Sequence, residues 1–227
     1  MSQFHAVAID GPAGAGKSTL AKQAADALSF LYVDTGAIYR SAGWYMKENG
    51  ISPDNASAVA AVLPDVKIEI RHGADTLQHM LVGGRDVTEE IRLPEMSRYA
   101  SAVAAIPAVR EFLLEMQRSA ARNGNVIMDG RDIGTVVLPD ADVKIFLTAS
   151  PEARARRRCE ELSLRGTPQE YEEVLRDMRL RDENDKNRAA APLKMAPDAV
   201  LLDTSALDFA QSEAALIKII KEKMHEN

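Results

Sequence analysis

The chain has 227 residues, of which 46% are hydrophobic and 27% are charged. This composition is typical of a globular protein and argues against wholesale disorder, and the length allows one good core with a small insertion. The formal net charge of −6 argues against a general nucleic-acid coat, because binding to a phosphate backbone needs an excess of Lys and Arg over a broad surface.

The single cysteine, Cys159, cannot form an internal disulfide, and the sequence has no cluster of Cys and His at metal-ligand spacing. The first ten residues lack the pattern of a secretory signal, and no later run approaches about 18 apolar residues. We therefore expect a cytoplasmic protein with no membrane contact. A monomer is favoured because no long apolar face is left without a core to join.

Short apolar runs alternate with stretches of helical period, which is the pattern of a parallel sheet with crossover helices. The predicted strands are residues 6–10, 31–34, 125–129, 143–147 and 199–203. Several of them end on Asp, at the edge where a parallel sheet places its ligand site.

Two stretches between these strands carry an apolar stripe at helical spacing, and we expect both helices to pack on the sheet. The stripes are Leu20, Ala24 and Leu28 in one helix, and Val109, Leu113, Met116 and Ala120 in the other, which is predicted to stop at residues 123–124. Residues 66–71 alternate strictly between apolar and polar, and residues 77–82 form a second strand-like run after a Gly-containing turn. That segment predicts an antiparallel insertion.

Two further helices are predicted in the C-terminal half. Residues 167–170, Thr-Pro-Gln-Glu, fit a capping box with Pro at the first helical position, followed by a stripe of Tyr171, Leu175 and Met178. Ser150-Pro151 opens the other helix, which carries Arg154, Arg156, Arg157 and Arg158. These arginines form either a lid that clamps ATP or a solvated basic face.

The strongest signal is the segment Gly-Pro-Ala-Gly-Ala-Gly-Lys-Ser-Thr, which fits the phosphate-loop pattern G-x-x-x-x-G-K-[ST] between a predicted strand and a predicted helix. Its backbone N–H groups would face phosphate oxygens, Lys17 would neutralise the β- and γ-phosphates, and Ser18 would ligate Mg²⁺. The alternatives are a glycine-rich turn that binds nothing, and a GTPase, which would need an Asn-Lys-x-Asp segment that the sequence lacks. The predicted ATP-binding residues are Gly11, Pro12, Ala13, Gly14, Ala15, Gly16, Lys17, Ser18 and Thr19.

Phosphoryl transfer depends on positioning and charge neutralisation, so a nucleotide kinase should direct several arginines at the loop. Arg40, after the second strand, would bind an acceptor phosphate or be an ordinary surface arginine. After the third strand, Asp129 occupies the position that supports Mg²⁺, usually through water. Arg131 and Asp132 would then serve phosphate and an exocyclic amine, or form a turn salt bridge with each other.

Charged residues continue the apolar stripe of the capped helix. Arg181, Asp185 and Arg188 follow Leu175 and Met178 at spacings of three and four, which would keep them on one face. They indicate either a cleft or a salt-bridge ladder on a solvated helix.

Taken together, these motifs resemble the bacterial cytidylate kinases. The agreement covers nearly the whole chain, in residues 11–19, 34–40, 101–110, 129–137 and 181–192, and the insertion at about 64–93 resembles the small antiparallel addition of the bacterial type. The resemblance implies transfer of the γ-phosphoryl group of ATP to CMP or dCMP, in pyrimidine nucleotide metabolism. The implied fold is the α/β nucleoside monophosphate kinase fold, a five-stranded parallel sheet flanked by helices, with a small antiparallel β insertion and a helical lid.

The resemblance also implies roles for individual residues. Lys17, Asp129, Arg131 and Arg188 would act in catalysis, and Arg157 would join the ATP-binding residues. For the acceptor, the phosphate would be held by Arg40, Arg131 and Arg188, the cytosine edge by Ser101, Arg110 and Asp132, and the sugar by Arg181 and Asp185, with Thr35 where some relatives have serine.

The implied organisation is a single kinase domain over residues 1–227. Its core would be residues 1–40, 94–150 and 192–227, its monophosphate-binding region about 41–93, and its lid about 151–191. The expected partners are ATP, CMP or dCMP, and Mg²⁺, with no nucleic acid polymer. The alternatives are a kinase for UMP, AMP or another small acceptor, and a non-catalytic nucleotide-binding regulatory module whose ATP hydrolysis is incidental and does not depend on CMP.

Overall fold

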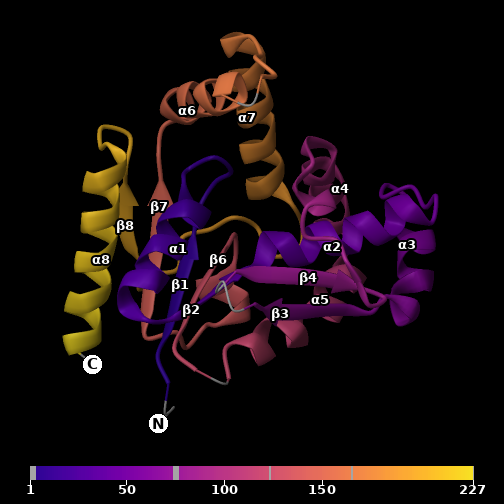
Figure 1. Cartoon of the computed structure of the whole chain (residues 1–227), viewed down its shortest axis with the longest axis horizontal. Helices are drawn as coiled ribbons and strands as arrows, with labels where there is room; N and C mark the ends of the chain where they lie inside the picture. The colour runs from indigo at the N-terminus through magenta and orange to yellow at the C-terminus, as the bar shows by residue number, and fades with distance from the viewer. Residues whose placement is uncertain (1–3, 74–76, 123, 165, 227) are drawn as a thin grey trace. The chain divides into compact units, whose positions relative to one another are not determined.

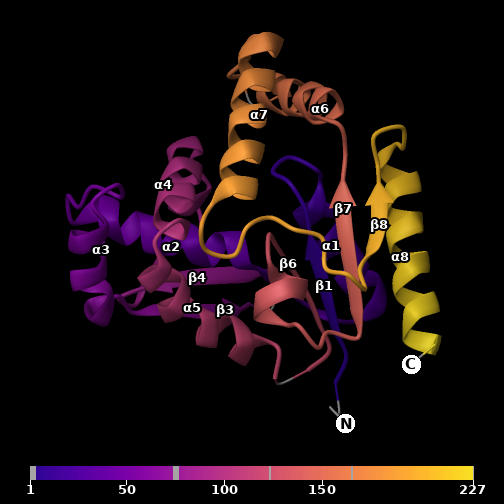
Figure 2. The same ribbon diagram turned by 180° about the vertical axis from the view of Figure 1, so that it is seen from behind.

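The computed structural model describes residues 4–73, 77–122, 124–164 and 166–226. The chain divides into two compact units, one made of Met1–Tyr32 and Asn123–Asn227 and the other of Val33–Arg122 (Figures 1 and 2). In the described part of the chain, no helix is long and apolar enough to cross a membrane.

The larger sheet is the five-stranded parallel sheet that the sequence predicts. Its strands are β1 (Ala6–Asp10), β2 (Leu31–Asp34), β6 (Val126–Gly130), β7 (Val143–Thr148) and β8 (Val200–Asp203), in the order β2-β6-β1-β7-β8. Strand β1 pairs in parallel with both β6 and β7, and β7 pairs in parallel with β8. The predicted strands are all present, although β6 lies one residue further along the chain than expected and β8 begins one residue later.

The core of the first unit lies between this sheet and two long helices, α1 (Lys17–Leu28) and α8 (Phe209–Glu226), which contact each other (Figure 1). Leu20 and Ala24 are buried against the sheet and Leu28 packs at the edge of this core, which confirms the predicted stripe. Leu216 and Ile220 contribute the matching face of α8. Burial of these aliphatic side chains fixes the start of α1, and therefore the end of the phosphate loop.

The first unit also contains the short helix η3 (Ile133–Val137) and the helix pair α6 (Pro151–Leu164) and α7 (Tyr171–Asn187). Leu175 and Met178 are buried between α6 and α7, as their spacing predicts. Ser150 caps α6, because its hydroxyl accepts a hydrogen bond from the Ala153 N–H at 3.1 Å.

The predicted capping box of α7 is wrong. The helix begins at Tyr171, so residues 167–170 precede it, and no side chain caps its first turn in the described structure. The Thr167 N–H instead donates to the Leu162 carbonyl at the end of α6, at 3.0 Å. Thr167 is therefore used to terminate the preceding helix, a competition that a sequence pattern does not reveal.

The second unit combines helices with a small antiparallel sheet. Strands β3 (Ile68–His72), β4 (Gln78–Val82) and β5 (Arg85–Asp86) pair antiparallel in that order, which confirms the predicted insertion. The turn predicted between the first two strands includes residues 74–76, which lie outside the described residues. The helices of this unit are α2 (Thr35–Glu48), α3 (Ala56–Val62), η1 (Leu63–Asp65), η2 (Glu90–Arg92), α4 (Pro94–Ala104) and α5 (Pro107–Ala120).

The apolar face of helix α5 lies in the core of the second unit, whereas the sequence predicted that it would join the core of the five-stranded sheet. Its buried residues Val109 and Leu113 belong to the core of the second unit, with side chains from α2, α3 and α4. The predicted stop of this helix involves residue 123, which lies outside the described residues, and the helix ends at Ala120. A helical period identifies the apolar face of a helix but leaves open what that face packs against.

Candidate functional site

The phosphate loop connects β1 to α1, and its glycines are required by the backbone. Gly14 and Gly16 have φ values of 73° and 87°, a left-handed conformation that favours glycine. A Cβ atom on Gly11 would lie 1.9 Å from the carbonyl oxygen of Leu147, so only glycine fits where β1 approaches β7. No side chain of the described residues caps the start of α1, which leaves its first N–H groups available to an anion.

Lys17 lies at the end of this loop, with only 5% of its surface exposed. Its Nζ donates to the Pro12 carbonyl at 2.8 Å, across the loop. The pKa of Lys17 is lowered to about 7, mainly by burial and also by the positive charge of Arg131, while the carboxylates of Asp129 and Asp10 oppose this shift. The Lys17 side chain therefore lies where the negative charge of a bound phosphate would balance the positive charge of its ammonium group.

Ser18 and Asp129 are brought together as predicted. The Ser18 hydroxyl donates to Asp129 Oδ2 at 2.9 Å, and Tyr32 donates its phenolic O–H to Asp129 Oδ1 at 2.8 Å. A hydroxyl and a carboxylate at this spacing suit Mg²⁺, which takes oxygen ligands, keeps several waters and is commonly bound through one carboxylate and substrate phosphates. Among the described residues, no group of three or more His, Cys, Asp or Glu could hold a metal ion by itself.

Asp10, at the end of β1, is a buried carboxylate that sequence reasoning did not single out. It accepts hydrogen bonds from the N–H groups of Ile133 at 2.7 Å and Gly134 at 2.8 Å. Burial raises the pKa of Asp10 to about 6, even though these two N–H bonds lower it. Asp10 thus fixes the start of η3, directly after Asp132, and the Asp at the end of the predicted strand was the available signal.

Arginines and carboxylates of the first unit pair across its elements. Arg131 Nε donates to Asp185 Oδ2 of α7 at 2.8 Å, and Arg188 Nη2 contacts Asp132 Oδ1 at 3.4 Å. Arg131 and Asp132 therefore each have a partner on the segment around α7. The alternative left open by the sequence was a turn salt bridge between these two residues. Arg181 is half-buried, and burial together with the charge of Arg131 lowers the pKa of its guanidinium.

The spacing argument for Arg188 is wrong, although the residue does reach the same region. Helix α7 ends at Asn187, and Arg188 has the extended backbone angles φ −61° and ψ 139°. Its side chain is directed by Asp132 and by the Ala191 carbonyl rather than by the helix. Helical periodicity fails here because the helix stops one residue earlier.

The four arginines of α6 have different environments. Arg154 is fully buried, Arg157 and Arg158 are half-buried, and Arg156 is exposed. Arg157 donates through Nη2 to the Thr204 carbonyl at 2.6 Å and through Nη1 to the Thr204 hydroxyl at 3.2 Å, in the segment after β8. The interpretation as a uniform solvated basic face is therefore wrong, since three of the four side chains are partly or fully buried.

In the second unit, Asp34 organises the start of α2. It accepts the Ala37 N–H at 2.9 Å, as an N-cap, and its other oxygen pairs with Arg40 Nη2 at 2.7 Å. Thr35 is buried beside it. Arg40 Nε is buried without a hydrogen-bond partner in the described structure, which leaves a donor for an anion.

Gln78 of the β insertion also holds this segment, through the backbone of Asp34. Its Oε1 accepts the Asp34 N–H at 2.8 Å, and its Nε2 donates to the Asp34 carbonyl at 3.1 Å. The side-chain amide thus pairs with one residue as a neighbouring strand would. The sequence offered no signal for this contact, because Gln78 and Asp34 are 44 positions apart.

Ser101 and Arg110, predicted to read a cytosine, lie on successive helices of the second unit. Ser101 is exposed on α4. The Arg110 guanidinium of α5 lies 5.5 Å from the ring centroid of Tyr39 and donates to the Ala104 carbonyl at 3.4 Å. Arg110 is therefore held in place by a cation–π contact.

A protein-family model described as cytidylate kinase matches residues 7–222 of this chain. The cytidylate kinase of Carboxydothermus hydrogenoformans is 49% identical over 217 residues, covering 96% of this chain and 97% of the relative. That of Thermosipho melanesiensis is 47% identical, with the same coverage of 96% and 97%.

Among solved structures, an uncharacterized protein from Eubacterium ventriosum has a TM-score of 0.52 at 12% identity and covers 96% of this chain and 98% of its own. This likeness concerns the fold alone. The family model and the two close relatives extend over nearly the whole sequence, including the phosphate loop, Asp129 and the arginines around α7. The chain belongs to the cytidylate kinase family.

Proposed function

We propose that this protein transfers the γ-phosphoryl group of ATP to CMP, and to dCMP, giving ADP and CDP or dCDP. Family membership supports this reaction. The observation that carries it is the position of Arg131, which lies close enough to Lys17 to lower its pKa but is not part of the phosphate loop. Cationic side chains from two separate segments, Lys17 and Arg131, suit a reaction in which a donor phosphate and an acceptor phosphate are brought into contact.

On the donor side, ATP binds to residues 11–19, with backbone N–H groups on its phosphates and Lys17 at the β- and γ-phosphates. Arg157 contributes to the ATP site beside the segment after β8. Ser18 and Asp129 would hold Mg²⁺, Asp129 through water. When bound, the ion neutralises charge on the phosphate oxygens.

On the acceptor side, the roles follow the resemblance. Arg131, Arg188 and Arg40 bind the CMP phosphate, and the unpaired Arg40 Nε supports that assignment. The cytosine edge is read by Ser101, Arg110 and Asp132. The sugar is bound by Arg181 and Asp185. Thr35, which is close to Arg40 in the sequence, also belongs to the acceptor site.

The chemistry needs no side-chain nucleophile, because the CMP phosphate is already anionic. A CMP phosphate oxygen forms a bond to the γ-phosphorus while the bond to the β,γ-bridging oxygen breaks, leaving ADP. The arginines and Lys17 neutralise charge as the phosphoryl group moves. The segment at about 151–191 acts as a lid that excludes water, which would otherwise compete as acceptor.

The test is ADP formation from ATP in the presence of CMP, dCMP, UMP or AMP, each at several concentrations. We expect the highest kcat/KM with CMP or dCMP. Equal rates with AMP and CMP would assign a different acceptor, and ATP consumption that ignores every monophosphate would indicate a regulatory nucleotide-binding module.

The protein is further proposed to act as a cytoplasmic monomer that binds no nucleic acid polymer. Its large exposed apolar side chains are spread over separate elements, including Leu93, Leu164 and Leu201. Gel filtration with light scattering should give the 24.8 kDa of one chain, and a species of twice that mass would refute the monomer.

A further inference from the structure

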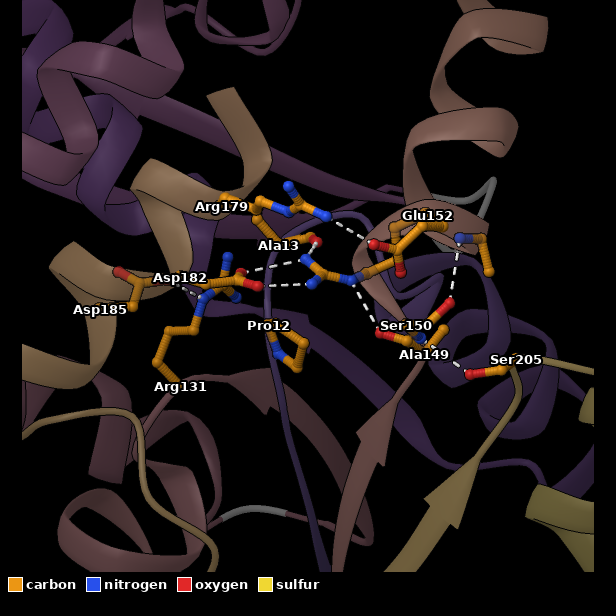
Figure 3. A network of polar contacts seen from close by, with 12 residues as sticks. Pro12, Ala13, Arg131, Ala149, Ser150, Glu152, Arg179, Asp182, Asp185 and Ser205 are labelled. Atoms are coloured by element: carbon orange, nitrogen blue, oxygen red, sulfur yellow. Dashed lines mark hydrogen bonds and ion pairs between the residues drawn. The ribbon is translucent and has the colours of Figure 1, made fainter. Parts of the chain in front are cut away.

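Arg154 is a deeply buried charged side chain beside the phosphate loop, with 2% of its surface exposed. Its Nε donates to the Ala149 carbonyl at the end of β7, at 2.9 Å, and its Nη1 donates to the Ala13 carbonyl of the loop, at 2.8 Å. Both terminal nitrogens also donate to the carboxylate of Asp182 on α7, the Nη1 bond being 3.0 Å long (Figure 3).

This network joins three elements at one point. Arg154 comes from the first turn of α6, Asp182 from α7 and Ala13 from the phosphate loop. The loop also packs directly against both helices, because a Cβ atom on Gly14 would lie 3.0 Å from the Met178 side chain and 3.7 Å from Arg154 Cβ. The position of the loop is therefore set by α6 and α7 as well as by β1 and α1.

The direction of the Ala13 carbonyl has a consequence for phosphate binding. In a trans peptide the C=O and the following N–H point in opposite directions, so a bond that fixes the Ala13 carbonyl also fixes the Gly14 N–H, pointing away from Arg154. Gly14 is one of the residues whose N–H would face ATP. Arg154 thus orients a phosphate-binding amide without touching the nucleotide.

Stability alone does not account for this pair. A buried ion pair loses hydration on both partners, and an apolar pair of similar volume often stabilises a protein as well or better. Only a guanidinium has enough donors in a fixed fork to serve two carbonyl groups and a carboxylate together. Four of its five N–H groups are used in the bonds described, so Arg154 has little left to offer a ligand.

We infer that Arg154 and Asp182 form a positioning pair for the phosphate loop. Arg154 orients the Ala13–Gly14 peptide, and Asp182 fixes the guanidinium and thereby keeps α7, with Arg181 and Asp185, in register with the loop. This inference rests on the proposed function, since what the pair positions is the ATP site. Sequence reasoning placed Arg154 in a lid or on a basic face and passed over Asp182, although Asp182 continues the buried stripe of Leu175 and Met178.

The structure provides a matched control. Arg179 Nη2 pairs with Glu152 Oε1 at 2.8 Å, joining the same two helices, but this pair is exposed and contacts no loop residue among its described bonds (Figure 3). Arg179→Met removes an ion pair between α6 and α7 without disturbing the loop. Surface pairs contribute little, so this variant should keep kcat/KM within about twofold of wild type.

The experiment compares three variants with wild type: Arg154→Lys, the apolar double variant Arg154→Met/Asp182→Leu, and Arg179→Met. Melting temperature, affinity for a fluorescent ATP analogue, and kcat and KM for ATP and CMP are measured for each. We expect Arg154→Lys and the double variant to lose about 10²-fold in kcat/KM for ATP, the loss typical of a small misplacement of the reacting groups. Their ATP-analogue affinity should fall too, while the double variant melts close to wild type.

The inference is overturned if the double variant regains both wild-type melting temperature and wild-type kcat/KM, because the pair would then serve folding alone. Should the double variant not fold, Arg154→Lys decides: it keeps the charge opposite Asp182, and unchanged kinetics in it would refute the positioning role. Absence of CMP-dependent turnover in wild type would instead count against the proposed function, and the analogue-affinity comparison would still test the positioning pair.

Discussion

The residues around the phosphate loop bury charges of both signs in a small volume. Lys17 and Asp10 illustrate the effect, since burial moves the pKa of one down to about 7 and of the other up to about 6. Each shift disfavours the charged form in the free enzyme. A bound triphosphate would reverse this balance for Lys17, because it supplies the missing counter-charge.

Lys17→Met should therefore separate stability from activity. Removing a buried ammonium should leave the melting temperature unchanged or raise it, whereas kcat should fall about 10²- to 10³-fold, as expected for loss of one charge-stabilising donor. Thermal unfolding and steady-state kinetics at saturating ATP and CMP measure the two effects. A variant with wild-type kcat would contradict the assignment of the loop.

Asp10 predicts a specific pH dependence of stability. Its pKa is about 6 in the folded protein against 3.8 in the unfolded chain, so between these pH values the folded state binds more protons. Its contribution to the free energy of unfolding is therefore full below about pH 4 and declines as pH rises through 6, by on the order of 3 kcal/mol.

Asp10→Asn removes this titration. The free energy of unfolding of wild type minus that of the variant should therefore decline over the same pH range. Urea unfolding of both proteins at pH 4.5 and pH 7 gives the difference. A difference that grows with pH would mean that Asp10 is stabilised as a carboxylate in the folded state.

Some pairings between residues could be predicted from the sequence and others could not. Ser18 and Asp129 were expected together, because a phosphate loop and a strand-end Asp meet at the same sheet edge. The partners of Arg131 and Arg154 depend on where α7 lies against the loop. That tertiary contact leaves no local pattern, except that Asp182 interrupts an apolar stripe.

At the scale of elements, the parallel strands were predicted almost residue by residue, since buried strands are continuous apolar runs. The ends of helices were less predictable. Thr167 serves α6 instead of capping α7, and α7 ends before Arg188. Helix termini depend on which neighbouring backbone groups need a partner, which the sequence alone does not specify.

The β insertion has a structural task in its own unit, through the contact between Gln78 and Asp34. Gln78→Met keeps the length of the side chain but leaves the Asp34 N–H and carbonyl without their partner, at a cost of about 1–3 kcal/mol. Because Thr35 follows Asp34 directly and Arg40 pairs with the Asp34 carboxylate, we expect KM for CMP to rise more than KM for ATP.

Arg71→Ala is the control for this change, because Arg71 is exposed on β3 of the same insertion and pairs only with Glu69 among its described contacts. It should leave the melting temperature and both KM values near those of wild type. Equal increases in KM for CMP and ATP in Gln78→Met would indicate general loosening rather than a role in acceptor binding.

At the scale of the whole molecule, each of the two units contains a separate part of the predicted site. The first unit contains the phosphate loop, the predicted Mg²⁺ ligands and the arginines around α7, and the second contains Arg40, Ser101 and Arg110. The family could be inferred from the sequence because its motifs extend over both units. The division of the chain into residues 33–122 and the remainder follows from contacts and was not evident in the sequence.

Transfer of the labelled γ-phosphoryl group of ATP, followed by chromatographic separation of the products with and without CMP, tests the proposed reaction most directly. We predict that the label appears in CDP in an amount equal to the ADP formed, and that little is released without CMP. Label released as inorganic phosphate at the same rate in both samples would contradict the account.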